Sequence, residues 1–138
     1  MTKQEILEFM TKNPVFSLAT NDGKRPRVRM MMLCRSDASG IIFTTGRDKD
    51  VNKQLQANQA VELCFYSAEQ ELQVRVEAAV EMQDDLELKK KIVEAFPFLK
   101  PWVEENGYEV MVVYRLRNAR ATAWTMQTDR EPKKYVRL

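Results

Sequence analysis

The chain has 138 residues, the length of one domain, and we expect a single domain over residues 1–138. Its 22 basic and 20 acidic residues leave a net charge of +2, which carries no nucleic-acid or membrane signature. The sequence holds no histidine, which excludes Ser–His–Asp triads, His-ligated zinc and His-ligated haem. Chemistry therefore either comes from a bound cofactor or does not occur.

Cys34 and Cys64 are the only cysteines, and both lie in apolar, strand-like runs without CxxC spacing. This pattern is typical of reduced, buried thiols and gives no metal site. The N-terminus reads as a charged amphipathic segment rather than a signal peptide, and no apolar run is long enough to cross a membrane. We therefore expect a cytoplasmic protein with neither a membrane nor a nucleic acid as partner.

The first element is predicted to be a helix. Thr2 and Glu5 match a capping box, and Asn13-Pro14 should end the helix. One apolar face carries Ile6, Leu7, Phe9 and Met10.

Strands are predicted next, over residues 15–20 and 27–35, joined by the turn residues 21–23. In the second strand the odd positions mix arginines with Met31 and Leu33, whereas the even positions are all apolar. We therefore expect the even positions to face the core. They are Val28, Met30, Met32 and Cys34.

The middle of the chain predicts a short strand over 41–45, a helix over 49–57 capped by Asp48, and a strand over 60–67. The clearest alternation follows over 72–82, and its length suits a coiled, closed sheet. One face of this strand holds Leu72, Val74, Val76, Ala78, Val80 and Met82.

A second helix is expected from Asp84-Asp85 to about Phe96, broken by Pro97 and Pro101. A final strand pair is expected over 109–117 and 119–126, before a charged tail without clear pattern. Hairpin-length loops favour a mainly antiparallel β-barrel with peripheral helices. No GxGxxG or Walker A sequence is present.

Arg27 and Arg29 share the odd face of their strand, beside Met31 and Leu33. They are either a solvated pair or an anion site, because arginine binds phosphate through a planar fork. Residues 44–49 offer a second candidate, since Thr44, Thr45 and Lys49 surround a predicted helix start, where backbone N–H groups favour anions.

Gln73 and Arg75 share the outward face of the strand over 72–82. They are either solvated polar residues or amide and cation partners for a planar, polar ring. Trp124 alternates with Thr122 and Met126, so it is either a core or interface aromatic or a ring contact.

Together these segments resemble the pyridoxamine 5′-phosphate oxidase-like family, the FMN-binding split barrels, over residues 15–126. The resemblance implies a mainly β fold, a six-stranded antiparallel split β-barrel with peripheral helices, and a homodimer with FMN at the interface. The matching segments are Pro26-x-x-Arg29-Met30-Met31-Met32-Leu33, Phe43-Thr44-Thr45 with Lys49, and Gln73-Val74-Arg75-Val76-Glu77.

Carried over residue by residue, the resemblance implies that Arg29 and Lys49 grip the FMN phosphate, with Arg27 nearby. Gln73 would contact the flavin ring, and Trp124 would approach it from the partner subunit. The residues implied to line the cofactor are Met30, Met31, Met32, Thr44 and Thr45.

Three departures separate this chain from the oxidases of the family. Cys34 stands where they place a lysine for the substrate phosphate, Ala78 replaces a glycine, and the tail has no Arg-x-His motif. The cofactor site is retained in this comparison and the vitamin-B6 substrate is not.

The resemblance implies an FMN-dependent oxidoreductase for a small planar substrate, with NAD(P)H as a candidate reductant. Nothing in the sequence singles out a catalytic residue among Tyr66, Tyr108 and Tyr114. Two alternatives stay open. One is a flavin or deazaflavin carrier, buffer or sensor without specific turnover, and the other is a cofactor-free interaction protein.

Overall fold

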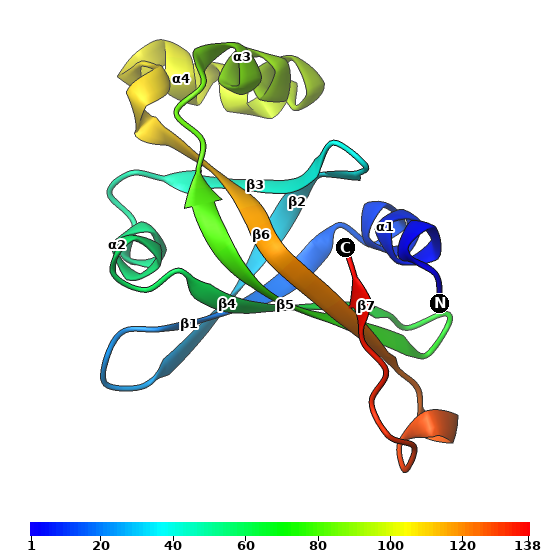
Figure 1. Ribbon diagram of the computed structural model, residues 1–138. Helices are drawn as coiled ribbons and strands as arrows, with labels where there is room; N and C mark the ends of the chain where they lie inside the picture. Colours follow the sequence, from blue (N-terminus) through cyan, green and yellow to red (C-terminus); the bar gives the residue numbers. More distant parts are fainter.

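Six antiparallel strands close into a barrel in the order β3-β2-β1-β4-β5-β6, and β3 pairs with β6 to complete the ring (Figure 1). A short seventh strand, β7, joins β6 at its C-terminal half. The computed structural model describes residues 1–138. The strands are β1 (Val15–Asn21), β2 (Pro26–Asp37), β3 (Gly40–Gly46), β4 (Ala60–Ser67), β5 (Leu72–Met82), β6 (Met111–Trp124) and β7 (Val136–Arg137).

The barrel interior is packed with aromatic and β-branched side chains. The Phe16 ring lies 5.0 Å from the Phe65 ring and 5.7 Å from the Phe43 ring, between centroids. Each such pair contributes about 0.5–1.5 kcal/mol beyond the burial of its area. The predicted core face of β5 is confirmed at Val74, Val76 and Val80, all of which are buried, and the barrel class is confirmed with it.

The predicted core face of β2 is wrong at Val28, Met30 and Met32, whereas Cys34 packs against an apolar cluster outside the barrel interior. Val28, Met30 and Met32 are 70%, 63% and 39% exposed, whereas Leu33 is 4% exposed and Met31 packs against the core. Both faces of this strand carry apolar residues, so alternation alone leaves their assignment ambiguous. The register with β1 decides the assignment, because Arg27, Arg29 and Met31 lie opposite the three inward-facing residues of β1.

The predicted C-terminal strand pair is a single continuous strand, β6. Glu77 pairs with Arg120 and Ala79 with Arg117, so three steps along β6 match two along β5. The extra residue makes a β-bulge, in which Asn118 adopts φ 53°. The break predicted between residues 117 and 119 is therefore a bulge within one strand.

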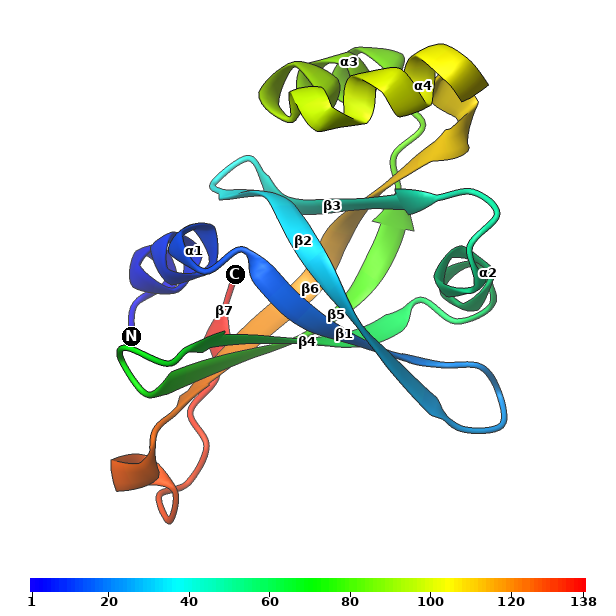
Figure 2. The same ribbon diagram turned by 180° about the vertical axis from the view of Figure 1, so that it is seen from behind.

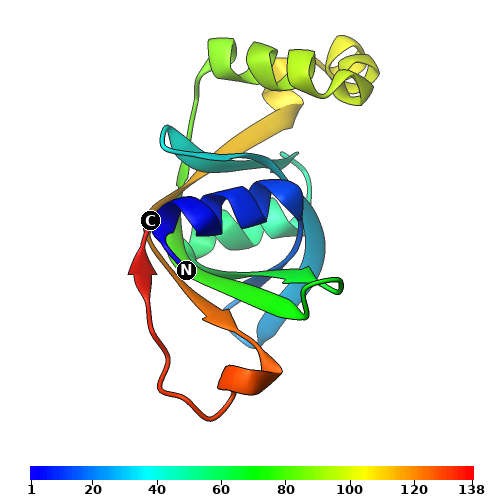
Figure 3. The same ribbon diagram turned by 90° about the vertical axis from the view of Figure 1, so that its right-hand side faces the viewer.

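The helix α1 (Lys3–Lys12) has the predicted capping box, and its four predicted apolar residues are buried in the barrel core. Figure 3 shows it lying across the barrel beside the chain ends. The helix α2 (Asp50–Ala57) follows β3. Its N-cap is Lys49, without a side-chain cap, so the prediction of Asp48 as cap is wrong.

The helices α3 (Leu86–Ala95) and α4 (Lys100–Asn106) lie together at one end of the molecule (Figure 2). Asp85 caps α3 as predicted, accepting from Leu88 N at 3.1 Å. Pro101 lies in the first turn of α4 and breaks nothing there, because that position needs no backbone donor. A second core joins these helices to β3 and β6 through Ile42, Ile92, Val93, Val103, Met111 and Val113.

Three short 3₁₀ segments complete the chain: η1 (Pro97–Leu99), η2 (Tyr108–Val110) and η3 (Met126–Thr128). The tail after η3 returns to β6 as β7, where Arg137 pairs with Arg120 and Val136 with Ala121. This strand was not predicted, because two paired residues leave no detectable alternation.

Candidate functional site

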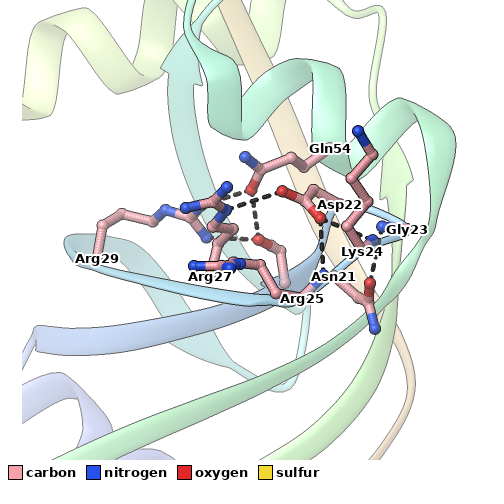
Figure 4. A network of polar contacts seen from close by, with 9 residues as sticks. Asn21, Asp22, Gly23, Lys24, Arg25, Arg27, Arg29 and Gln54 are labelled. Atoms are coloured by element: carbon pink, nitrogen blue, oxygen red, sulfur yellow. Dashed lines mark hydrogen bonds and ion pairs between the residues drawn. The ribbon is translucent and has the colours of Figure 1, made fainter.

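The β1–β2 hairpin concentrates cations around one carboxylate, Asp22 (Figure 4). Asp22 accepts from the backbone N–H of Arg25 at 3.0 Å and of Lys24 at 2.9 Å, and from Arg27 Nε at 2.8 Å. The bond from the Arg25 backbone, then that from Arg27, lowers the pKa of Asp22 to about 2. Arg27 is therefore held in an exposed ion pair rather than aimed into a cavity.

Arg29 lies on the neighbouring stretch of β2 and reaches α2 (Figure 4). Its guanidinium donates to the Leu18 carbonyl at 3.3 Å, to Thr20 Oγ1 at 2.7 Å and to Gln54 Oε1 at 2.5 Å. A guanidinium has five N–H donors, so two remain without an acceptor in the chain. Burial and then the charge of Arg27 lower the pKa of Arg29.

That positive charge has no carboxylate partner, since no ion pair includes Arg29. A desolvated cation beside a second cation is electrostatically unfavourable until an anion joins it. The two remaining donors of Arg29 can meet an anion in the bidentate manner that suits phosphate.

Lys49 is the N-cap of α2, the helix that also contains Gln54, the acceptor of Arg29. Its aliphatic stem passes close over Gly46, where an added Cβ would lie 3.4 Å from Lys49 Cγ. The two cations Arg29 and Lys49 therefore both lie along one short helix, α2.

The two predicted threonines point to different faces of β3. Thr45 is buried opposite Val112 of the barrel core, whereas Thr44 lies opposite Val113 of the second core and contacts Cys34 Sγ at 4.0 Å. Within one chain their side chains cannot line the same ligand.

Gln73 and Trp124 are brought together, directly opposite each other on β5 and β6. Gln73 Oε1 accepts from Cys64 Sγ at 3.4 Å, and Trp124 Nε1 donates to Asp129 at 2.8 Å. Both side chains are half-buried and lie on the outer face of the sheet, since Val74 beside Gln73 faces the core.

Met30 and Met32 lie on this same outer face, on β2, and Met31 points the other way. Met30 Sδ accepts from Ser17 Oγ at 3.2 Å. In contrast, Arg29 lies on the inward side of β2, opposite Leu18 of the core. The predicted site residues therefore fall into two groups on opposite faces of the sheet.

Arg75 has an unsatisfied donor that sequence reasoning did not anticipate. Its Nε is completely buried and has no hydrogen-bond partner, although it lies on the outer face opposite Cys64 and Thr122. Sharing a face with Gln73 was the only sequence signal. The Nε of Arg115 is also buried without a hydrogen-bond partner, but the guanidinium of Arg115 packs directly on Gly40.

A cavity of about 1000 Å³ opens between α1, the adjoining ends of β5 and β6, and the C-terminal tail. Gln73, Arg75 and Trp124 all line it. Arg29 and Lys49 do not line it, whereas Phe9, Leu72 and Ala121 from the core side of the barrel do.

Both cysteines are free and half-buried. Burial raises the pKa of the Cys34 and Cys64 thiols, which makes them poor nucleophiles at neutral pH. No three histidine, cysteine, aspartate or glutamate side chains are grouped to hold a metal ion. No helix has the length and apolar character needed to cross a bilayer.

Three comparisons place the chain among known proteins. A stretch of 72 residues is 42% identical to a pyridoxine/pyridoxamine 5′-phosphate oxidase of Anaeromyxobacter dehalogenans, covering 51% of this chain. The same stretch covers 36% of that relative, so the chain matches about a third of its length.

Among solved structures, a NimC/NimA family protein from Clostridium acetobutylicum aligns with a TM-score of 0.81 at 24% identity, over 99% of this chain and 93% of that one. HutZ, the heme storage protein from Vibrio cholerae, aligns with a TM-score of 0.61 at 19% identity, over 85% and 90%. At these identities the likeness shows the fold alone.

The family model of pyridoxamine 5′-phosphate oxidase matches residues 2–125, which include every strand of the barrel. The chain therefore belongs to the pyridoxamine 5′-phosphate oxidase family.

Proposed function

We propose that two copies of this chain bind FMN between them and use it as the redox group for a small planar substrate. The observation that carries the proposal is Arg29, a partly desolvated guanidinium with two free N–H donors and no carboxylate partner. The FMN phosphate supplies the missing anion, and Lys49 at the start of α2 adds a second cation.

The outer face offers complementary groups for the flavin ring. Met30 and Met32 present exposed thioether side chains, which pack well against aromatic rings. Gln73 carries an amide that can donate to ring carbonyls and accept from ring N–H groups. The residues present therefore fit the proposed cofactor in charge and in polarity.

The separation of the two groups supports a site made by two chains. Arg29 and Gln73 lie on opposite faces of the sheet, so a second copy has to complete the site. The outer face is also unusually apolar for a surface, which favours a protein partner. Its exposed apolar residues include Val15, Val28, Met30, Met32 and Tyr66.

In this proposal the flavin supplies hydride or electron transfer, and the protein supplies binding, orientation and electrostatics. Arg29 and Lys49 hold the phosphate. Gln73 fixes the orientation of the ring, and the methionine face together with the partner excludes water from it. The chain needs no side chain of its own as nucleophile.

An FMN titration of the Arg29→Gln variant tests the phosphate assignment. The substitution removes the charge but keeps a polar side chain, so we expect FMN binding to weaken by about 1–3 kcal/mol. Visible absorbance and flavin fluorescence report the dissociation constant directly. Arg25→Gln is the matched control, because Arg25 lies on the same hairpin and its side chain makes no hydrogen bond or ion pair.

Equal FMN affinity in the Arg29→Gln variant and the wild type would refute the phosphate assignment. A wild-type protein that binds no FMN at all would identify a cofactor-free interaction protein instead. Bound flavin that NAD(P)H cannot reduce and no acceptor can reoxidise would identify a flavin carrier rather than an oxidoreductase.

A further inference from the structure

Gln54 is the residue through which helix α2 contacts Arg29, and the flavin proposal gives it no role. Its Oε1 accepts from the Arg29 guanidinium at 2.5 Å and from Thr20 Oγ1 at 2.6 Å. Thr20 Oγ1 in turn accepts from Arg29 at 2.7 Å. These three hydrogen bonds form a closed ring that joins β1, β2 and α2, and Figure 4 shows Gln54 reaching the guanidinium.

The ring is fixed by the barrel core on which it lies. Thr20 is 4% exposed, and Leu55, which follows Gln54 on α2, is buried in the core. The Leu18 carbonyl accepts a further hydrogen bond from Arg29 at 3.3 Å. The guanidinium is planar and rigid, so these contacts also fix the directions of its two remaining N–H donors.

All three acceptors of Arg29 are uncharged oxygens: a backbone carbonyl, a hydroxyl and an amide. They orient the guanidinium without cancelling its positive charge. The neighbouring carboxylates do not cancel it either, because Asp22 pairs with Arg27 at 2.8 Å. Asp50 lies one turn before Gln54 on α2 and forms no ion pair.

The neutral partner is not the one that folding alone would favour. An opposite charge within about 4–6 Å stabilises a partly buried cation, and arginine pairs especially well with carboxylates. A glutamate has the length and shape of a glutamine, so one atom separates Gln54 from such a partner. Departures of this kind from the most stable local choice are expected at functional sites.

We propose that Gln54 is a positioning residue that determines the specificity of the phosphate site, because its neutral amide orients Arg29 and leaves the positive charge available to the phosphate. The inference rests on the proposed function in taking FMN as the source of that phosphate. It adds that selection of FMN over riboflavin, which has the same ring without the phosphate, depends on a residue that acts through Arg29.

The Gln54→Glu variant tests the inference in flavin fluorescence titrations with FMN and riboflavin. Gln56→Glu is the matched control, since it makes the same charge change at an exposed position of the same helix. We expect Gln54→Glu to bind FMN at least tenfold more weakly than Gln56→Glu does. Riboflavin affinity should differ by less than twofold between the two variants, because riboflavin has no phosphate for Arg29 to bind.

Urea unfolding without flavin separates positioning from folding. The Gln54→Glu variant should unfold at a midpoint no lower than that of Gln56→Glu, because the new carboxylate pairs with Arg29. The Gln54→Met variant removes the acceptor without adding charge, so it should lower the midpoint and weaken FMN less than Gln54→Glu does. Weaker FMN binding at undiminished stability is a combination that a purely structural residue does not produce.

Equal FMN affinity in Gln54→Glu and Gln56→Glu would overturn the inference and leave the proposed function standing. A loss of FMN and riboflavin affinity by the same factor would also overturn it, because Gln54 would then act on the whole site.

A wild-type protein that binds no FMN would overturn the proposed function, and inorganic phosphate would then decide the inference. At matched ionic strength, phosphate should raise the urea midpoint above its value in chloride for the wild type and Gln56→Glu, but not for Gln54→Glu. The same response to phosphate in all three proteins would overturn the inference as well.

Discussion

In the β1–β2 hairpin one carboxylate holds the turn together and pairs with a single arginine. Asp22 binds two backbone N–H groups and Arg27, and its charge is satisfied within the loop. Arg29, two residues beyond Arg27, is left without a carboxylate. The composition of the strand left open whether these arginines are a solvated pair or an anion site, and only the three-dimensional contacts separate the paired arginine from the unpaired one.

The stability of the hairpin should depend on pH through Asp22. Its pKa falls from 3.8 to about 2 on folding, so the folded state binds the proton more weakly. The stabilisation is therefore complete above pH 3.8 and is lost as the pH falls through about 2. In urea unfolding between about pH 5 and about pH 2, we expect wild type to lose more stability than Asp22→Asn.

The matched control for that series is Asp84→Asn, because the Asp84 side chain forms no hydrogen bond or ion pair. This variant should follow the wild-type pH dependence. Parallel curves for the wild type and Asp22→Asn would mean that Asp22 contributes nothing through its charge.

Arg75 marks the limit of sequence reasoning at this scale. Its place on the outward face of β5 follows from simple alternation with Val74 and Val76. Alternation cannot predict that the Nε of Arg75 is buried without a hydrogen-bond partner. That depends on which neighbouring residues cover the Nε and which carboxylates already pair with other cations.

Among the elements, β4 and β5 have the bounds predicted from the sequence. One apolar face and one polar face make their alternation unambiguous. In β2 both faces carry apolar residues, so the pattern indicated a strand correctly but assigned its core face wrongly. The difference is physical, because β2 buries one face in the core and also carries exposed apolar residues on its other face.

The bulge in β6 changes which residues of the strand face the core. Before it Tyr114 and Leu116 face the core, and after it Ala119 and Ala121 do, so the inward positions change from even to odd. One inserted residue thus lets a single strand of 14 residues pair with β3 at one end and β5 along most of its length. Period-two alternation cannot predict this, and the two halves therefore look like separate strands.

Asn118 should be the sensitive residue of this bulge. At φ 53°, Asn118→Val should cost about 1–2 kcal/mol of unfolding free energy, because a β-branched residue resists the left-handed region. Asn118→Gly is the matched variant and should change stability by less than about 0.5 kcal/mol. Equal losses in the two variants, measured by urea denaturation, would show that the backbone conformation is not the cause.

At the scale of the whole molecule, the barrel leaves one broad apolar surface uncovered. Val28 and Met30, both on β2, are 70% and 63% exposed. Composition could not reveal this surface, since those residues look like core until the register is known.

A charge on that surface should separate the proposed dimer. In sedimentation velocity we expect wild type to be a dimer and Met30→Asp to be a monomer, because a buried unpaired carboxylate disfavours association. Leu86→Asp is the control, since Leu86 is 50% exposed at the start of α3, where an acidic residue suits the helix. A dimeric Met30→Asp protein would assign the interface to another surface.

In the proposed dimer, the placement of Arg29 and Gln73 on opposite faces of the sheet couples FMN binding to association of the chains. A cofactor that needs both groups binds only the associated chains, so by mass action it strengthens their association as much as association strengthens its binding. Dilution should therefore raise the apparent FMN dissociation constant, and added FMN should lower the protein concentration at which dimers form. In the proposed dimer, the fraction of chains that carry FMN should therefore rise with the concentration of the protein.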